Sequence, residues 1–460
     1  EYSDNLKLIL LTANPMYNQA NEIIWILNMM LLNDSRPMLH ESQIFDAEGS
    51  LMSDGVTLLQ NVSRGYISYV RGENPITFPL RLYPVHNETM IYKDNSPSIS
   101  LFNTEIEDKI SILELYGSMM NGFQKKVYMS EVKKYEGFEK IRIQPDEGKL
   151  LQLSNIVYPA MTFDDLQETS EIENVYGDRG FDSIFQKSQR GKHVSYSYRK
   201  HMIDQYGPIL DITNLGNYSS KLKSIIRCIN MSDGILFIYT NYIKSGIMPL
   251  LLALEHEGYE KYGGQKILHY PAYKKGQDRS TMKKEPISYN GKRQSHPEFK
   301  KKEFHRGRYM VISGGNDGLS TNLEEELKIV TSEDNKYGQH IKIIIGTSVA
   351  SEGLDFKYLR GIHVLEPWHN LNKIEQVIGR GIRYCSHSLL LPEERNVSIY
   401  LHSSCVDDIN NETIDSYVYR LAEKKSIIIG DIETILKKNA VDRRLFRDVN
   451  IIKKKDGIKQ

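Results

Sequence analysis

Cysteine is scarce in this sequence, and no hydrophobic stretch is long. The chain has three cysteines in 460 residues, Cys228, Cys385 and Cys405. They are too few and too far apart for a disulfide framework or a four-ligand zinc site, which points to a reducing compartment. No run approaches the roughly 18 apolar residues of a membrane span, and the first residues do not resemble a signal peptide. These absences predict an intracellular protein with no membrane contact and no bound structural metal.

The chain also has no net charge. Lys+Arg and Asp+Glu both number 59, so any surface that binds nucleic acid must arise from local segregation of charge. The hydrophobic content of 40% is typical of a globular protein, and at about 150 residues per domain the length allows about two to four domains. Glu1 is not a methionine and an apolar stretch follows it closely, so we expect it to be an internal position of a longer polypeptide.

Short apolar runs predict the strands of a sheet. Each run is β-branched or leucine-rich, as strands buried on both faces are. Helical patterns follow several of them, and a repeated strand-then-helix order predicts an α/β fold with a parallel sheet flanked by helices. The runs lie at residues 8–12, 235–239, 341–345 and 362–365, and the helical patterns at 18–32, 245–257, 322–330 and 372–378.

One stretch, residues 272–308, is strongly basic. It carries twelve Lys/Arg against four Asp/Glu, with few apolar residues. Such a segment buries too little to offset the entropy of ordering it. Two interpretations remain open, namely a solvated flexible insertion in a surface loop and a mobile basic arm that binds a nucleic-acid backbone.

Small polar residues follow the apolar run at 341–345. If that run is a strand, they lie at the carboxyl edge of the sheet, where open α/β folds bind ligands. Small side chains let backbone amides and hydroxyls approach a phosphate closely. The stretch begins with Gly346, Thr347 and Ser348 and continues to Glu352, Gly353, Leu354 and Asp355.

Two arginines and a glutamine follow in the sequence QVIGRGIR. Gln376, Arg380 and Arg383 are spaced by four and three residues, which places them on one face of an expected helix. Two guanidinium groups projecting together suit a transferring phosphoryl group. The alternative is that these arginines only pair with carboxylates on the surface.

The order of these elements resembles motifs V and VI of superfamily 2 helicases and remodelling ATPases. The resemblance rests on the small polar loop, Glu-Gly-Leu-Asp, a strand, Glu-Pro-Trp, and Gln-x-x-Gly-Arg-x-x-Arg at the usual spacing. It implies that Arg380 and Arg383 are arginine fingers at the γ-phosphate of ATP and that Gln376 supports them. Glu352, Gly353 and Asp355 would then border the nucleotide, and Thr347 and Ser348 would contact the nucleic-acid backbone.

Further segments extend the resemblance. Thr12, Ala13 and Asn14 resemble motif III, usually Thr/Ser-Ala-Thr-Pro, which couples the nucleotide state to the nucleic-acid track; Asn14 stands where a threonine is usual. Residues 234–253 resemble motif IV, which implies backbone contacts from Thr240 and Asn241. The strand and loop at 309–314 resemble the next such element, with Ser313 and Gly314 beside a phosphate. Ordinary core strands and helices are the alternative for each segment.

Residues 14–28, 63–79 and 348–387 narrow the resemblance to helicase-like proteins of large DNA viruses, the group that includes the poxvirus early transcription factor small subunit and nucleoside triphosphatase I. It covers residues 1–80 and 220–440. It implies a viral transcription ATPase that acts on double-stranded or single-stranded DNA. Viral RNA polymerase or a second transcription-factor subunit would be its partner, and the viral factory, the host cytoplasm or the virion its location.

The resemblance also implies a division of the chain. Residues 1–34 would end the first helicase lobe, and residues 216–405 would form the C-terminal RecA-like lobe with the basic insertion at 272–308. Residues 406–460 would be a helical extension. Residues 35–215 have no clear period and no predicted fold.

No G-x-x-x-x-G-K-[ST] sequence is present, since the three Gly-Lys pairs precede leucine, histidine and arginine. We therefore expect another part of a longer protein to bind the phosphates and most of the Mg²⁺, and this chain alone to hydrolyse no ATP. Two alternatives are a non-catalytic nucleic-acid-binding or scaffolding remnant, and a restriction or chromatin-remodelling motor.

Overall fold

The computed structural model shows a chain divided into two compact units. It describes residues 7–70, 77–84, 89–135, 146–160, 172–191, 193–271, 284–300, 302–314, 319, 322–351 and 353–445. Unit 1 comprises Glu1–Asn74, Trp368–Lys373 and Leu421–Gln460, and unit 2 comprises Pro75–Pro367 and Ile374–Arg420. Unit 1 is thus built from three segments and unit 2 from two, so segments distant in sequence form each unit.

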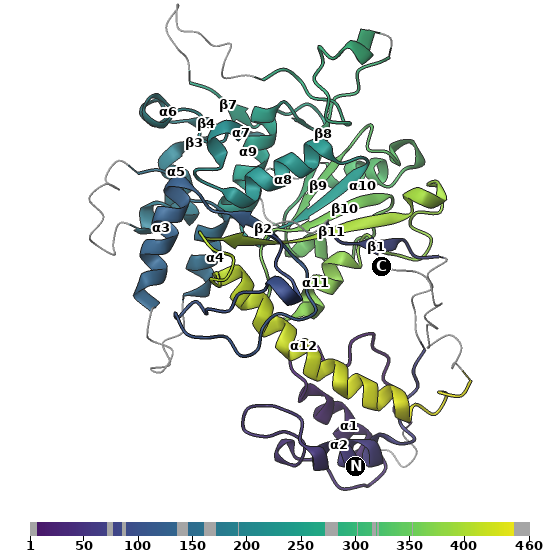
Figure 1. Cartoon of the computed structure of the whole chain (residues 1–460). Helices are drawn as coiled ribbons and strands as arrows, with labels where there is room; N and C mark the ends of the chain where they lie inside the picture. Colours follow the sequence, from purple (N-terminus) through teal and green to yellow (C-terminus); the bar gives the residue numbers. More distant parts are fainter. Residues whose placement is uncertain are drawn as a thin grey trace, which may run out of the picture. The chain divides into compact units, whose positions relative to one another are not determined.

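A parallel sheet forms the centre of unit 2 (Figure 1). Its strand order is β1-β11-β10-β5-β9-β8-β6, and β2 also pairs with β11. All of these pairings are parallel. The strands are β1 (Leu80–Leu82), β2 (Leu115–Met119), β5 (Ile235–Tyr239), β6 (Glu260–Lys261), β8 (Arg308–Ile312), β9 (Ile343–Gly346), β10 (Leu359–Val364) and β11 (Asn396–Cys405).

The apolar runs explain the central strands. Every residue of β5 and β9 is buried, as the unbroken apolar runs at 235–239 and 341–345 predict for strands covered on both faces. The run at 362–365 overlaps the second half of β10. The helices of unit 2 are α3 (Gly122–Val132), α4 (Glu147–Asn155), α5 (Gly177–Ile184), α6 (Lys200–Tyr206), α7 (Ile212–Leu215), α8 (Ser220–Met231), α9 (Met248–Glu257), α10 (Leu323–Val330) and most of α11 (Leu371–Ile378). The predicted parallel α/β fold is confirmed.

Residues 35–215, for which the sequence predicts no fold, contribute to this sheet. They supply β1 and β2, which pair end to end along one side of β11 while β10 occupies the other side. They also supply β3 (Phe185–Arg190) and β4 (His193–Tyr198), which form a second, three-stranded sheet with β7 (Leu268–His269). The main sheet therefore extends beyond residues 216–405.

Unit 1 is helical. Its core joins α1 (Glu22–Asn33) and α2 (Ser53–Ser63) to the part of α12 (Ile414–Asn439) that follows Leu421. The buried side chains of Leu27, Ile44 and Ile432 belong to this cluster. The helix predicted at 18–32 is thus confirmed as α1, and a helix within 406–460 as α12.

The strand predicted at residues 8–12 is wrong. These residues have no regular structure, and Ile9 and Leu11 are 79% and 92% exposed. An apolar run forms a strand only when a neighbouring strand takes up its backbone hydrogen bonds. No described strand pairs with this segment.

The basic stretch is largely ordered where the structure describes it. Residues 272–283 and 301 lie outside the described part, but Ile287 and Ser288 are buried and bridge to Arg293 and Arg306. The two cations Lys284 and Arg293 form ion pairs with Glu257 of α9. The composition predicted a flexible or mobile segment. Residues 284–300 and 302–308 instead pack within unit 2, because buried carboxylates compensate their charge.

We predict that Gly291→Ala destabilises unit 2. Gly291 has φ +78°, and an added Cβ would lie 1.9 Å from the backbone oxygen of Asn230. Overpacking of this kind costs about 1–3 kcal/mol. Gly263, at φ +82° with nothing within 4 Å, is the matched control because Gly263→Ala adds only backbone strain. The check is the free energy of unfolding in urea; equal losses for both variants would mean that residues 284–308 do not pack as described.

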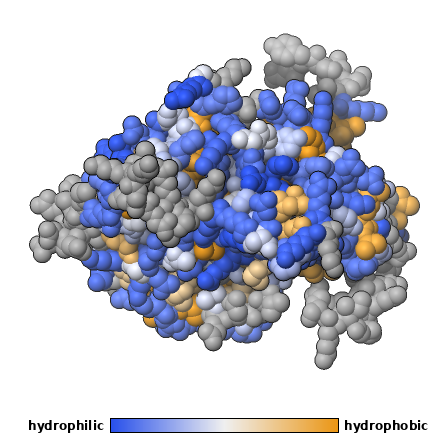
Figure 2. Space-filling view, turned by 90° about the horizontal axis from the view of Figure 1, so that it is seen from above, coloured by the Kyte–Doolittle hydropathy of each residue, from blue (hydrophilic) through white to orange (hydrophobic). Residues whose placement is uncertain are grey.

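The face of the molecule in Figure 2 is mostly hydrophilic, with scattered hydrophobic patches. Within the described residues, no helix combines the length and apolar character that crossing a membrane requires.

Candidate nucleotide and nucleic-acid site

Polar residues gather where three adjacent strands of unit 2 end. The amide of Thr240, after β5, donates to the oxygen of Gly346 at 3.1 Å, and the amide of Thr347, after β9, donates to the oxygen of Ile312 at 3.1 Å. The ends of β5, β9 and β8 are therefore locked side by side. Ser313 and Gly314 follow β8 at the same edge.

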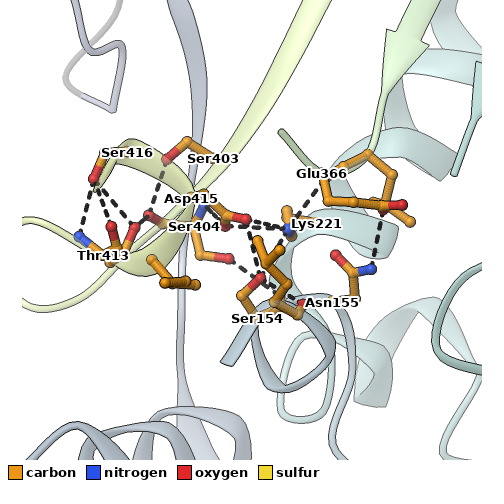
Figure 3. A network of polar contacts seen from close by, with 12 residues as sticks. Ser154, Asn155, Lys221, Glu366, Ser403, Ser404, Thr413, Asp415 and Ser416 are labelled. Carbon is orange, nitrogen blue, oxygen red and sulfur yellow. Dashed lines mark hydrogen bonds and ion pairs between the residues drawn. The ribbon is translucent and has the colours of Figure 1, made fainter. Parts of the chain in front are cut away.

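Glu366, just after β10, organises this edge. Its buried carboxylate accepts hydrogen bonds from the hydroxyl of Thr240 at 3.1 Å, from the amide of Asn241, and from the side-chain amide of Asn155 at 3.1 Å (Figure 3). Burial, as the largest effect, raises the pKa of Glu366, while the Asn241 amide and the Lys221 ammonium oppose the rise. The carboxylate thus holds the loop after β5 against the end of β10.

This arrangement predicts a pH-dependent stability. A carboxyl group with a raised folded pKa contributes stability below its ordinary pKa of 4.5 and loses that contribution as the pH rises through the folded value. Glu366→Gln removes the titration. We therefore expect the unfolding free energy of Glu366→Gln, relative to the unsubstituted chain, to increase as the pH is raised above 4.5. Urea unfolding across this range checks the sign; a difference that stays flat or falls would contradict it.

A buried ion pair lies beside Glu366. Lys221 at the start of α8 and Asp415 at the start of α12 have no solvent exposure, and Nζ lies 3.0 Å from the nearer carboxylate oxygen. Nζ also donates to the hydroxyl of Ser154 at 3.0 Å and to the oxygen of Leu365 at 3.1 Å, while Asp415 accepts from the amide of Ser404 at 2.8 Å (Figure 3). Both charges are thereby compensated by hydrogen bonds.

The two arginines converge on one carboxylate. Arg383 Nη2 lies 3.1 Å and Arg380 Nη1 lies 4.0 Å from Oδ1 of Asp355. Arg380 also donates to the oxygen of Leu354 at 3.3 Å. The side chains of Arg380, Arg383 and Asp355 are 15%, 46% and 69% exposed, so the cluster opens to solvent. Gly353 precedes it with φ +72°, a left-handed conformation that favours glycine.

The expectation that the arginines lie on a helix is wrong. Helix α11 ends at Ile378, and Arg380 and Arg383 lie in the turns that follow. The turn packs directly on β10, because an added Cβ on Gly381 would lie 2.4 Å from Leu359. The amide of Phe356 donates to the oxygen of Arg380 at 2.9 Å, so backbone contacts rather than helical spacing bring the arginines to Asp355.

Residues 293–385 match the family described as helicase conserved C-terminal domain. They include residues 379–383, called here the arginine turn. This part of the chain is similar to a helicase C-terminal domain. The chain is 25% identical over 98% of its length to a mimivirus protein (Acanthamoeba polyphaga mimivirus) named as a candidate ATP-dependent RNA helicase, and 24% identical over 97% to a second mimivirus protein so named. It is also 23% identical over 95% of its length to the early transcription factor large subunit homolog of African swine fever virus.

The chain spans 39%, 63% and 36% of the length of these three relatives. The predicted resemblance to superfamily 2 helicases of large DNA viruses is confirmed, as is the α/β fold of the helicase C-terminal domain.

The predicted site residues of unit 2 fall into two groups. Asp355, Arg380 and Arg383 form one, with Gly353 beside them and Gln376 half-buried on α11. The second group lies just after strands β5, β8 and β9, at the edge of the sheet called here the strand-end edge. There Ser348 and Gly314 are exposed, Asn241 is half-buried, and Thr347 and Ser313 are buried. Thr240 is fully buried and bonded to Glu366, which does not support the predicted contact to nucleic acid.

Glu352 and the predicted motif III residues belong to neither group. Glu352 lies outside the described residues. Thr12, Ala13 and Asn14 belong to unit 1, where all three are exposed and the Asn14 amide donates to the Thr12 hydroxyl at 3.1 Å.

Sequence reasoning missed the buried residues that support this edge of the sheet. Glu366 belongs to the Glu-Pro-Trp sequence that carries part of the resemblance, yet the pattern assigned it no role. Lys221 and Asp415 are 194 residues apart in sequence, and neither stands in a motif. A lysine and an aspartate each beginning a helix give no signal that they will meet.

Proposed function

We propose that this chain is the arginine-donating part of a nucleic-acid-dependent ATPase of viral transcription type. The observation that carries the proposal is the convergence of Arg380 and Arg383 on the single carboxylate of Asp355. Two guanidinium groups held together beside a glycine loop would suit the charge of a γ-phosphate.

The Asp355 carboxylate stands in for phosphate oxygens. It is 69% exposed, and an ion pair this exposed contributes little stability, about 0–1 kcal/mol. A phosphoryl group with more negative charge can displace it. The backbone contact between Phe356 and Arg380 meanwhile keeps the turn in place. Preorganised donors of this kind do not have to be assembled when charge develops in the transition state.

ATP would be held between this chain and the part of the protein that supplies the phosphate-binding loop and most of the Mg²⁺ ligands. Hydrolysis would remove the γ-phosphate and release Arg380 and Arg383, and this cycle would drive movement along nucleic acid. Ser348, Gly314 and Asn241 at the strand-end edge would contact the sugar-phosphate backbone. DNA is the proposed track, and RNA polymerase or a transcription-factor subunit the proposed partner, in the viral factory, the host cytoplasm or the virion.

The test is ATP turnover by the whole protein, measured without nucleic acid and with double-stranded DNA, single-stranded DNA or RNA. We expect turnover that DNA stimulates. If only RNA stimulates turnover, RNA rather than DNA is the track, in keeping with the RNA helicase names of the mimivirus relatives. Absence of turnover under every condition would favour a non-catalytic nucleic-acid-binding or scaffolding role.

A further inference from the structure

Strands β3, β4 and β7 form a three-stranded sheet (Figure 1). Apolar side chains on one of its faces are buried in the core of unit 2. In the antiparallel β3–β4 pair, Phe185 stands opposite Tyr198 and Arg190 opposite His193, and in the parallel β4–β7 pair Ser197 stands beside His269. Side chains of directly paired residues lie on the same face of a sheet. The residues that face the core of unit 2 are Phe185, Val194, Tyr196, Tyr198 and Leu268, all buried.

The opposite face is uniformly polar. Alternation along the strands places hydrogen-bond donors there, with no carboxylate and no apolar side chain. Their exposure ranges from half-buried to fully exposed. This surface, called here the hairpin face, consists of Gln186, Ser188, Arg190, His193, Ser195, Ser197 and His269.

The sequence of the β3–β4 hairpin is rich in positive charge. Residues 183–203 contain five Lys/Arg and no Asp/Glu, although the whole chain has equal numbers of both signs. Partial burial lowers the pKa of His269, and the charge of Lys266 and, to a smaller extent, that of Arg190 lower it further. The charges of Lys266, in the loop before β7, and of Arg190, on β3, therefore both act on His269.

These cations differ from others in unit 2. Lys244, Arg306 and Lys284 each form an ion pair with a carboxylate. Within the described part of the chain, Arg190 and Lys266 form no such pair, and both are exposed. A solvated surface of ordinary composition intersperses both signs of charge, whereas the hairpin face has an arginine, two histidines and neutral donors, and no carboxylate.

We infer that the hairpin face binds the phosphodiester backbone of nucleic acid. Arginine, lysine, serine and glutamine side chains are the groups that contact phosphate oxygens in protein–nucleic acid complexes, and a surface without carboxylates adds no repulsion. The inference rests on the proposed nucleic-acid-dependent activity and adds a contact surface outside the strand-end edge. An acidic protein segment is the other polyanion that would fit, but hydroxyl and amide donors favour the closely spaced oxygens of phosphates.

The experiment uses the whole protein carrying Arg190→Glu. Binding to fluorescent double-stranded DNA, single-stranded DNA and RNA is measured by anisotropy at several KCl concentrations, and the three probes identify which backbone is bound. The matched control is Lys328→Glu, which makes the same charge change at an exposed position on α10. We expect Arg190→Glu to weaken binding at least about tenfold, uniformly over probe sequences. The milder Arg190→Ala should lower the slope of log affinity against log salt by about 1.

Equal slopes and affinities for Arg190→Glu and Lys328→Glu would overturn the inference. So would loss of binding to polyglutamate with nucleic-acid binding unchanged, which would assign the face to an acidic protein. Because Arg190 lies outside the arginine turn, ATP turnover without nucleic acid should remain unchanged in Arg190→Glu. If the unsubstituted protein neither hydrolyses ATP nor binds nucleic acid, the proposed function is refuted together with this inference.

Discussion

Replacing Arg383 with alanine is expected to lower ATP turnover by the whole protein about 10³- to 10⁵-fold, the usual effect of removing an arginine finger. Arg383 is the more exposed of the two arginines and lies nearer to Asp355, at 3.1 Å. Its loss removes a bidentate cation from the position where γ-phosphate charge develops. Nucleic-acid binding should remain near normal, because the strand-end edge and the hairpin face are untouched.

Two further variants sharpen this test. Arg383→Lys keeps the charge but loses the planar fork, and we expect turnover between those of alanine and arginine. Arg227→Ala is the matched control, since Arg227 is an exposed arginine of the same unit on α8, away from Asp355. Steady-state phosphate release is the measurement. Turnover of Arg383→Ala equal to that of Arg227→Ala would show that the arginine turn only forms a surface ion pair.

Lys221→Met should destabilise unit 2 by about 3–5 kcal/mol, because it leaves the carboxylate of Asp415 buried without a cation. Methionine occupies a similar volume, so the loss reflects charge rather than a cavity. Lys221 and Asp415 are both completely buried. The pair also joins the starts of α8 and α12 to the loop after β10 through the Leu365 oxygen, 3.1 Å from Nζ.

The double variant Lys221→Met/Asp415→Asn separates the charge effect from the packing effect. It removes both charges and keeps an oxygen that can accept from the Ser404 amide. We expect it to recover most of the lost stability, as replacement of a buried pair often does. Lys328→Met on the surface of α10 is the control and should stay within about 0.5 kcal/mol. Urea unfolding gives all three values; a double variant as unstable as Lys221→Met would contradict the interpretation.

The sequence predicted the central strands because their burial on both faces leaves an unbroken apolar run, as in β5. It predicted the arginine cluster through motif spacing, although Gly379 and Gly381 end the helix that spacing alone suggested. It could not predict β1, whose three residues are partly exposed and gain their strand character only from pairing with β11. The sequence also did not predict that residues 284–300 and 302–308 pack against α9, because this packing depends on Glu257, a buried carboxylate on that helix.

The placement of β11 has a consequence for biosynthesis. Strand β2 pairs with residues 401–405, and β1 with residues 396–398, so neither can pair until about 300 further residues have emerged from the ribosome. Non-local parallel pairing of this kind folds slowly, and unpaired strand edges invite aggregation in the interval. Products truncated before residue 396 would lack the strand that closes this side of the sheet. We therefore expect heterologous expression to improve with chaperones and lower temperature, and shortened versions ending within the arginine turn to accumulate as insoluble protein.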